Sequence, residues 1–300
     1  MSVLPKYTKS VIAAMILVST LSIIFIVYFK KDADISNETY SYAGSRNIEC
    51  LYYNKADFMN IKKFEIEHEE WDVRGCIVPH HLLAKDLIHE VFQHVKKYNY
   101  KTVVLIGPDH ESKDMGKIFT TLNDWQTPMG ILKTDKKMTT ELLKNSFVSD
   151  NDEKITMEHS VSGIIPFIKY YMEDVEVISL VLTKQVKSED VNTLVEELYK
   201  NVDAEKTLFI ASIDFSHYLD LNKADSMDKI SIEAIQDDDI KKIMSFTNDN
   251  LDSPASLVTI LKLMDKSEVQ NKSVLNRSNS ELILKKRLKE TTSYITYLFY

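Results

Sequence analysis

Residues 102–110 read TVVLIGPDH, a run of apolar and β-branched side chains that stops at a glycine–proline pair. Such a run is typical of a strand buried on both faces of a parallel sheet. His110 stands two residues after this stop, behind Asp109. Because open α/β sheets bind ligands at the carboxyl ends of their strands, this stretch predicts both a central strand and a functional side chain at its end.

The same pattern recurs along the chain and alternates with amphipathic stretches. Further strand-like runs occupy residues 75–78, 175–182, 207–212 and 294–300. Apolar side chains recur at helical spacing over residues 82–98, 161–172, 191–199, 230–243 and 254–264. This alternation predicts an α/β fold, with a central mixed and mostly parallel sheet that carries helices on both faces.

The composition is that of a globular protein, with 44% hydrophobic and 27% charged residues in a chain of 300. Glycine and proline number six each, which excludes collagen-like and Pro/Gly-rich disordered chains. The net charge is −8, and residues 1–31 contain lysines but no acid, so the remainder is more acidic still. This charge argues against nucleic acid as a partner, because phosphate contacts need lysine and arginine.

Residues 10–29 form an uncharged run with Lys9 before it and Lys30 and Lys31 after it. A helix of that length spans roughly 30 Å, which matches the hydrocarbon core of a bilayer. A cleaved signal peptide is the alternative, but the run does not end in a small-residue cleavage site. The run therefore predicts one N-terminal transmembrane helix.

The expected domain organisation follows from this helix. It comprises a membrane anchor in residues 1–31, a linker in residues 32–48 and an α/β domain in residues 49–300. The positive-inside rule places the N-terminus inside, so we expect a single-pass membrane protein with an extracytoplasmic domain.

Two cysteines, Cys50 and Cys76, are the only ones in the chain, and no CxxC motif occurs. A thiolate zinc cluster is therefore excluded. The pair either forms one disulfide in an extracytoplasmic domain or remains as two buried thiols.

The histidines are distributed unevenly. Five of the eight follow strand-like runs or stand at helix starts with an acid nearby, and these are His80, His81, His110, His159 and His217. The other three lie in charged or amphipathic helical contexts and are expected at the surface: His68, His89 and His94. We expect the five to share a cleft, where imidazoles serve as metal ligands or as general acids and bases.

Common nucleotide and hydrolase motifs are absent from the sequence. There is no GxGxxG, GxxxxGK[ST], GxSxG or HExxH. Ser212 and Ser216 lie close to His217 in the sequence, which leaves a serine hydrolase as a minor alternative.

Taken together, the motifs around these histidines resemble the Memo-like family, also called AmmeMemoRadiSam system protein B. The matching stretches are Val78–His81, Leu105–His110, Asn123–Pro128, Glu158–Ser160 with Pro166, and Ser212–His217. The resemblance extends from Gly75 to the C-terminus. It implies the fold of class III extradiol dioxygenases, which are non-haem iron enzymes with two histidines and one carboxylate at the metal.

The resemblance also implies roles for individual residues. His80 and His110 match the two histidine metal ligands, for Fe(II) or Cu, and His217 matches the acid/base histidine. We place Asp214, His159 and Glu158 with His217 as catalytic residues. His81 and Asp109 are expected as additional cleft residues.

Two departures from the family pattern concern the site. The usual N-terminal His-Ala-Gly-Ser-Trp-Tyr segment is missing. The cysteine that is the third ligand in many relatives is also absent, and alignment on Pro254 places Asn250 there. A small shift of register instead offers Asp252, which would complete the facial triad expected for Fe(II). Alternatively, Asp252 and Ser253 cap the following helix.

These observations support two main functional hypotheses. The first is a metal-dependent, dioxygenase-like oxidoreductase at the membrane, acting on a small-molecule or peptide substrate. The second is a non-catalytic module that binds a ligand, a peptide or a metal ion at the membrane. A structural protein with an inactive cleft is a third reading.

Overall fold

The strand β3 (Thr102–Pro108) lies in the middle of the sheet, as its apolar sequence predicts. It pairs in parallel with β8 (Glu176–Leu182) on one side and with β9 (Thr207–Ser212) on the other. Six of its seven residues are buried. A strand with two parallel neighbours and a helical layer on each face has no edge in water, which explains the near absence of polar side chains.

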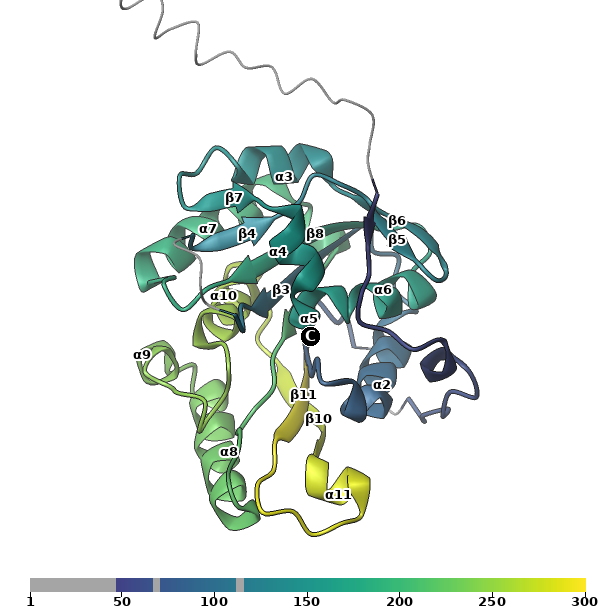
Figure 1. Ribbon diagram of the computed structural model, residues 1–300. Coiled ribbons are helices and arrows are strands. Elements are labelled where there is room, and N and C mark those ends of the chain that lie inside the picture. The colour runs from purple at the N-terminus through teal and green to yellow at the C-terminus, as the bar shows by residue number, and fades with distance from the viewer. Residues whose placement is uncertain (1–46, 67–70, 112–115) are drawn as a thin grey trace, which may run out of the picture. The chain divides into compact units, whose positions relative to one another are not determined.

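The computed structural model describes residues 47–66, 71–111 and 116–300, which form one unit (Figure 1). The remaining strands are β1 (Ile48–Glu49), β2 (Gly75–Val78), β4 (Ile118–Thr120), β5 (Trp125–Thr127), β6 (Gly130–Thr134), β7 (Val148–Asp150), β10 (Lys272–Asn279) and β11 (Ser293–Phe299).

The α-helices alternate with these strands along most of the chain. They are α2 (Lys85–Val95), α3 (Lys136–Leu142), α4 (Asp152–Met157), α5 (His159–Ser162), α6 (Ile165–Tyr171), α7 (Ser188–Asn201), α8 (Leu221–Gln236), α9 (Ile240–Met244), α10 (Pro254–Lys266) and α11 (Ser280–Leu284). Short 3₁₀ turns are η2 (Lys55–Phe58), η3 (Leu82–Ala84) and η4 (Ala204–Lys206).

The sheet is mixed, and its centre is parallel. Its strand order is β1-β5-β6-β8-β3-β9-β2-β11-β10, with β4 and β7 attached beside β8. The run from β6 to β2 is parallel throughout, whereas β11 pairs antiparallel with both β2 and β10. The predicted central sheet of an α/β fold is therefore confirmed.

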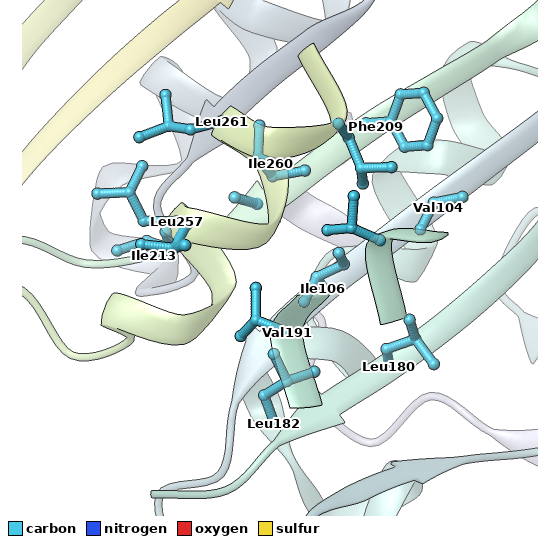
Figure 2. Packing of buried hydrophobic residues seen from close by; sticks show 14 of the residues in the cluster. Val104, Ile106, Leu180, Leu182, Val191, Phe209, Ile213, Leu257, Ile260 and Leu261 are labelled. Atoms are coloured by element: carbon cyan, nitrogen blue, oxygen red, sulfur yellow. The ribbon is translucent and has the colours of Figure 1, made fainter. Parts of the chain in front are cut away.

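Two apolar layers cover the sheet, because alternate side chains of each strand point to opposite faces. In β3, Val104 and Ile106 pack against α3, α7 and α10, and Figure 2 shows this layer with Ile260 of α10. Val103 and Leu105 of the same strand face α2 and α6 on the other side. Helices therefore lie on both faces, as Figure 1 shows.

Two predicted helices are interrupted in the structure. The helix predicted over residues 161–172 is broken between the end of α5 at Ser162 and the start of α6 at Ile165. The apolar spacing over residues 230–243 predicts a continuous helix, but α8 ends at Gln236 and α9 begins at Ile240. Asp238 between them has φ of 51° in the left-handed region. Asp239 then caps α9 by accepting a hydrogen bond from the Lys242 N–H. Aspartate favours such caps over helix interiors, so three consecutive aspartates interrupt the helix.

The predicted transmembrane helix is not supported, which corrects both the fold class and the membrane location. Among residues 47–66, 71–111 and 116–300, no helix is long and apolar enough to cross a bilayer. The longest of these helices, α8, has 16 residues, fewer than the ~20 that a span needs, and it carries several charges. Residues 10–29, for which the span was predicted, lie outside the described residues. The fold class is accordingly a mixed α/β fold.

Both cysteines are free and buried, with Cys50 3% and Cys76 0% exposed. They pack in the apolar layer on the α2 side of the sheet. Burial raises the pKa of both thiols far above the usual value, because a thiolate loses its hydration there. Of the two readings of this pair, the structure shows buried thiols.

We expect both thiols to resist alkylation in the folded protein. Iodoacetamide reacts with the thiolate, and the raised pKa together with burial removes that species at pH 8. Mass spectrometry after timed labelling, in buffer and in 6 M guanidinium as the control, measures the difference. Labelling of the native protein as fast as that of the denatured protein would contradict it.

Candidate metal centre

The predicted site residues gather at one edge of the sheet because their strands are parallel neighbours. His80 follows β2 by two residues, Asp214 follows β9 by two, and His110 follows β3 by two. These strands lie in the order β3-β9-β2, in register, so their carboxyl ends coincide. His159 reaches the same place as the first residue of α5, which contacts β3.

Three imidazoles form the centre of this cluster. The ring centroids of His110 and His159 lie 4.3 Å apart, and each lies 5.0 Å from that of His80. One ligand atom from each of the three can be chosen so that all lie within 4.8 Å of one another. The three side chains could therefore hold a metal ion, since neutral imidazole nitrogen is a common ligand.

Asp252 offers a carboxylate to the same cluster. Its Oδ2 lies 3.2 Å from His80 Nε2 and 3.7 Å from His110 Nε2. Its Oδ1 is buried without a hydrogen-bond partner among the described residues. A buried carboxylate oxygen of this kind fits a metal ligand, because burial without a partner is costly. Two imidazoles and one carboxylate are the donor set of a facial triad.

The structure distinguishes Asn250 from Asp252, a choice that alignment of the sequence left open. The Asn250 amide donates to Ser231 Oγ at 3.4 Å, towards α8. Asp252, two residues later, meets the histidines instead. Ser253, and not Asp252, caps α10, because its Oγ accepts from the Ser256 N–H. The register shift therefore brings a carboxylate to the cluster.

Glu158 fixes the orientation of two of the imidazoles. Its Oε1 lies 2.8 Å from His110 Nδ1 and 3.2 Å from His159 Nδ1, and it accepts from the Ser160 N–H at 3.1 Å. Its Oε2 accepts from the backbone N–H of His110 at 2.8 Å. Burial raises the pKa of Glu158, but the hydrogen bonds from His110 and His159 outweigh burial and hold the pKa well below its usual range.

An ionised Glu158 is an acceptor only, so the Nδ1 atoms of His110 and His159 donate to it. Their Nε2 atoms would then be the nitrogens that could bind a metal ion. Burial lowers the pKa of His110, but the hydrogen bonds to Asp252 and Glu158 outweigh it and raise the pKa to about 10.

His80 is the deepest of the three imidazoles and is 2% exposed. Its Nδ1 lies 3.3 Å from the Ser212 hydroxyl, and its backbone N–H donates to Asp214 Oδ1 at 3.1 Å. Burial lowers the pKa of His80, whereas the carboxylates of Asp214 and Asp252 raise it, and the net direction is upward. Asp214 therefore fixes the backbone of His80 by a hydrogen bond and also raises the pKa of its imidazole.

His217 and His81 lie at the border of the cluster. His217 Nδ1 is buried without a hydrogen-bond partner among the described residues. His217 lies close enough to the Asp252 carboxyl and to the His81 imidazole to contribute to the pKa shifts of both groups. Burial lowers the pKa of His81, and its Nδ1 accepts from the Leu83 N–H at the start of η3.

Asp109 is an ion-pair residue in this structure. Its Oδ1 lies 2.9 Å from the Lys154 ammonium and also accepts from the Glu111 N–H. The side chains of Asp109 and Lys154 are 0% and 8% exposed. The pair joins the end of β3 to α4, close to the start of α5.

A cavity of about 510 Å³ adjoins the cluster between the ends of β3 and β8 and the segment before α10. Asp252 and Asp109 line it, together with apolar residues such as Leu182 and Phe246. This volume lies in the range of small-molecule sites.

Sequence reasoning missed two contacts at the cluster. Ser212 was considered as a nucleophile, but its hydroxyl meets His80, and Ser216 Oγ donates to Asp228 at 2.6 Å. Within the described residues neither hydroxyl is hydrogen-bonded to His217, the histidine that lies close to both serines in the sequence. The Tyr52 ring lies 5.8 Å from that of His159, a contact between distant segments that no local motif signals.

The surface prediction for the other histidines is wrong at two positions. His89 and His94 on α2 are 1% and 6% exposed. His89 bridges the Tyr171 hydroxyl and the Asp57 carbonyl, which cover that side of α2. His68 lies outside the described residues.

These features define a class of protein, namely an α/β protein with a histidine–carboxylate cluster at the carboxyl edge of its sheet. The profile of the Memo-like protein family matches residues 52–297. The chain therefore belongs to the Memo-like family, and the resemblance of its motifs is confirmed.

Individual relatives are moderately similar. A MEMO1 family protein of Methanococcoides burtonii is 31% identical over 57% of this chain and 65% of its own length. A MEMO1 family protein of Methanosarcina barkeri is 30% identical over 59% of this chain and 67% of its own length. The chain thus aligns with about two thirds of these relatives. A crystal structure of an uncharacterized protein from Escherichia coli K12 covers 74% of this chain and 98% of its own, with 12% identity and a TM-score of 0.49.

We expect Lys154→Met to destabilise the fold by ~3–5 kcal/mol, because it removes the ammonium group that contacts the buried Asp109 carboxylate at 2.9 Å. Urea denaturation followed by circular dichroism measures the loss. The double variant K154M/D109L should recover most of it, since both charges are then gone.

The matched control for this pair is the exposed ion pair Lys144–Glu141, whose side chains are 65% and 38% exposed. Lys144→Met should change the free energy of unfolding by less than ~0.5 kcal/mol. Equal effects of K154M and K144M would contradict the assignment of the buried pair.

Proposed function

We propose that this protein is a metal-dependent oxidoreductase of the dioxygenase-like type, with its metal at the cluster of His80, His110 and Asp252. The observation that carries the proposal is the approach of Asp252 Oδ2 to the Nε2 atoms of both histidines, at 3.2 and 3.7 Å. Iron in the Fe(II) state is the metal that this donor set favours, and copper is the alternative.

A bound metal of this kind supplies Lewis-acid and redox chemistry to a substrate and to O₂. The protein residues supply position and proton transfer. Glu158 directs the Nε2 atoms of His110 and His159 into the cluster through their Nδ1 atoms. Ser212 meets the Nδ1 atom of His80, and Asp214 accepts a hydrogen bond from the His80 backbone N–H.

His217 is the residue that we assign to proton transfer. Its Nδ1 has no hydrogen-bond partner among the described residues, and the imidazole lies near Asp252. An imidazole beside a bound substrate can accept a proton and return it. The adjoining cavity of about 510 Å³ is large enough for a small-molecule substrate, or for one or two side chains of a peptide.

A metal-binding module without catalysis is the second candidate. The three imidazoles can hold an ion without Asp252. The side chains of His110 and His159 are 31% and 38% exposed, so an ion there could exchange with solvent or with a partner. The two candidates differ in their third ligand, which makes that ligand the quantity to measure.

We expect the full-length protein, loaded with Fe(II) under nitrogen, to bind about one equivalent of iron, measured by mass spectrometry after desalting. Asp252→Asn should lose most of this iron if the carboxylate is the third ligand, and His159→Ala should lose it if the third ligand is imidazole. H80A/H110A should lose it in either case, and His94→Gln, a buried histidine on α2, is the control. A folded wild type that binds neither iron nor copper would contradict both candidates.

Consumption of O₂ by the loaded protein with ascorbate then separates the oxidoreductase from the binding module. Turnover that is lost in D252N but retained in H94Q supports the oxidoreductase. Stoichiometric iron without O₂ consumption favours the module.

Glu158→Gln should weaken metal affinity by about 10–100-fold, the effect usual for a residue that orients a metal-ligating histidine. The amide is of similar size but cannot accept hydrogen bonds at both of its terminal atoms. Competition with a chelator of known affinity measures the change. Glu153→Gln on the exposed surface of α4 is the control, and equal affinities of E158Q and E153Q would rule out this role.

A further inference from the structure

The segment between β9 and α8 carries Asp214 and His217, and its backbone bonds to neighbouring elements. The Phe215 N–H donates to the Ser293 carbonyl at 2.9 Å. The Ser293 N–H donates back to the Ser216 carbonyl at 2.9 Å. These bonds fasten the first half of the segment to β11.

The second half of the segment contains an unfavourable turn. Tyr218 has φ of 56°, in the left-handed region that L residues with large side chains rarely adopt. Its side chain is 70% exposed, so little packing holds it there. The His217 N–H donates to the Asn248 carbonyl at 2.9 Å. A turn of this kind persists only when surrounding groups impose it.

Asp228, on the second turn of α8, lies against the inner side of this turn. It is 7% exposed, and its Oδ1 accepts from the Ser216 hydroxyl at 2.6 Å. The Ser216 backbone N–H and the Ser293 hydroxyl also approach this carboxylate and act to lower its pKa. Burial raises the pKa of Asp228, and these three donors act against burial.

No ammonium or guanidinium group within the described part of the chain forms an ion pair with Asp228. The nearby Arg277 pairs with Asp225 at 2.7 Å, one turn earlier on α8. A buried carboxylate without a cation is costly, and the donor groups of Ser216 and Ser293 offset that cost. The Asp228 carboxylate therefore interacts with both the backbone and the side chain of Ser216, the residue before His217.

We propose that Asp228 is the positioning residue of His217, and that it holds the turn of Ser216, His217 and Tyr218 so that the imidazole stays beside Asp252. The inference rests on the proposed function, in which His217 transfers protons. Asp228 touches neither the metal ligands nor the cavity beside them, so its effect passes through the turn alone.

The test compares Asp228→Asn with Asp225→Asn in the full-length protein. The amide in D228N has one acceptor oxygen, whereas the turn presents three donors. The N–H group of the amide therefore faces another donor. We expect the rate of diethylpyrocarbonate modification at His217, followed by peptide mass spectrometry at pH 7, to rise about tenfold, which corresponds to the loss of one hydrogen bond to a charged group. The imidazole resonances of His217 in a ¹H–¹⁵N spectrum should move as well.

The control D225N removes an exposed carboxylate from the same helix and should leave the reactivity and resonances of His217 within twofold of wild type. If Asp228 has only a structural role, D228N will lower the melting temperature, but its His217 will keep the reactivity and the resonances that are measured in D225N. That result would overturn the proposal. If D228N does not fold, Ser216→Ala removes one of the three donors and should produce a smaller change in the same direction, whereas an unchanged His217 in S216A would overturn it too.

Metal content separates this inference from the proposed function. D228N should retain the iron that the wild type binds, because His80, His110 and Asp252 are unchanged. A wild type without metal would defeat the proposed function, while a changed His217 in D228N would still establish Asp228 as its positioning residue.

Discussion

The four contacts of the Glu158 carboxylate are the interaction on which the candidate site depends. The two oxygens bind Nδ1 of His110, Nδ1 of His159, and the backbone N–H groups of His110 and Ser160. One side chain thus ties the end of β3 to the start of α5 and orients two imidazoles at once. This approach is possible because Gly107 has no side chain, since a Cβ there would lie 2.5 Å from Ser160 Oγ.

Much of the fold could be predicted from the sequence, because buried parallel strands have a local signature. The run at residues 102–106 defines β3, and the histidine after it lies at the functional edge, as expected from strand ends in α/β sheets. The break between α8 and α9 could not be predicted from apolar spacing, which continues through it, although the three aspartates at 237–239 carried the signal.

Features that depend on distant segments were harder to predict. His89 and His94 stand on a helix face that residues far away in the chain cover, so local polarity indicated exposure wrongly. The choice between Asn250 and Asp252 depended on which side chain turns towards α8, and only the packed structure decides that. The predicted membrane helix relied on composition alone, and the described helices give it no support.

The pairing of β2 with β11 has a consequence for how the protein is made. β2, which leads to His80, lies between β9 and β11, and Gly75 pairs with Phe299 in the last of the described strands. While the chain is being synthesised, one edge of β2 must wait without its partner until nearly all other elements have left the ribosome. Contacts between such distant segments form slowly. The strand that leads to the most buried imidazole of the cluster is therefore completed among the last steps of folding, and until then its open edge is a point where nascent chains can associate.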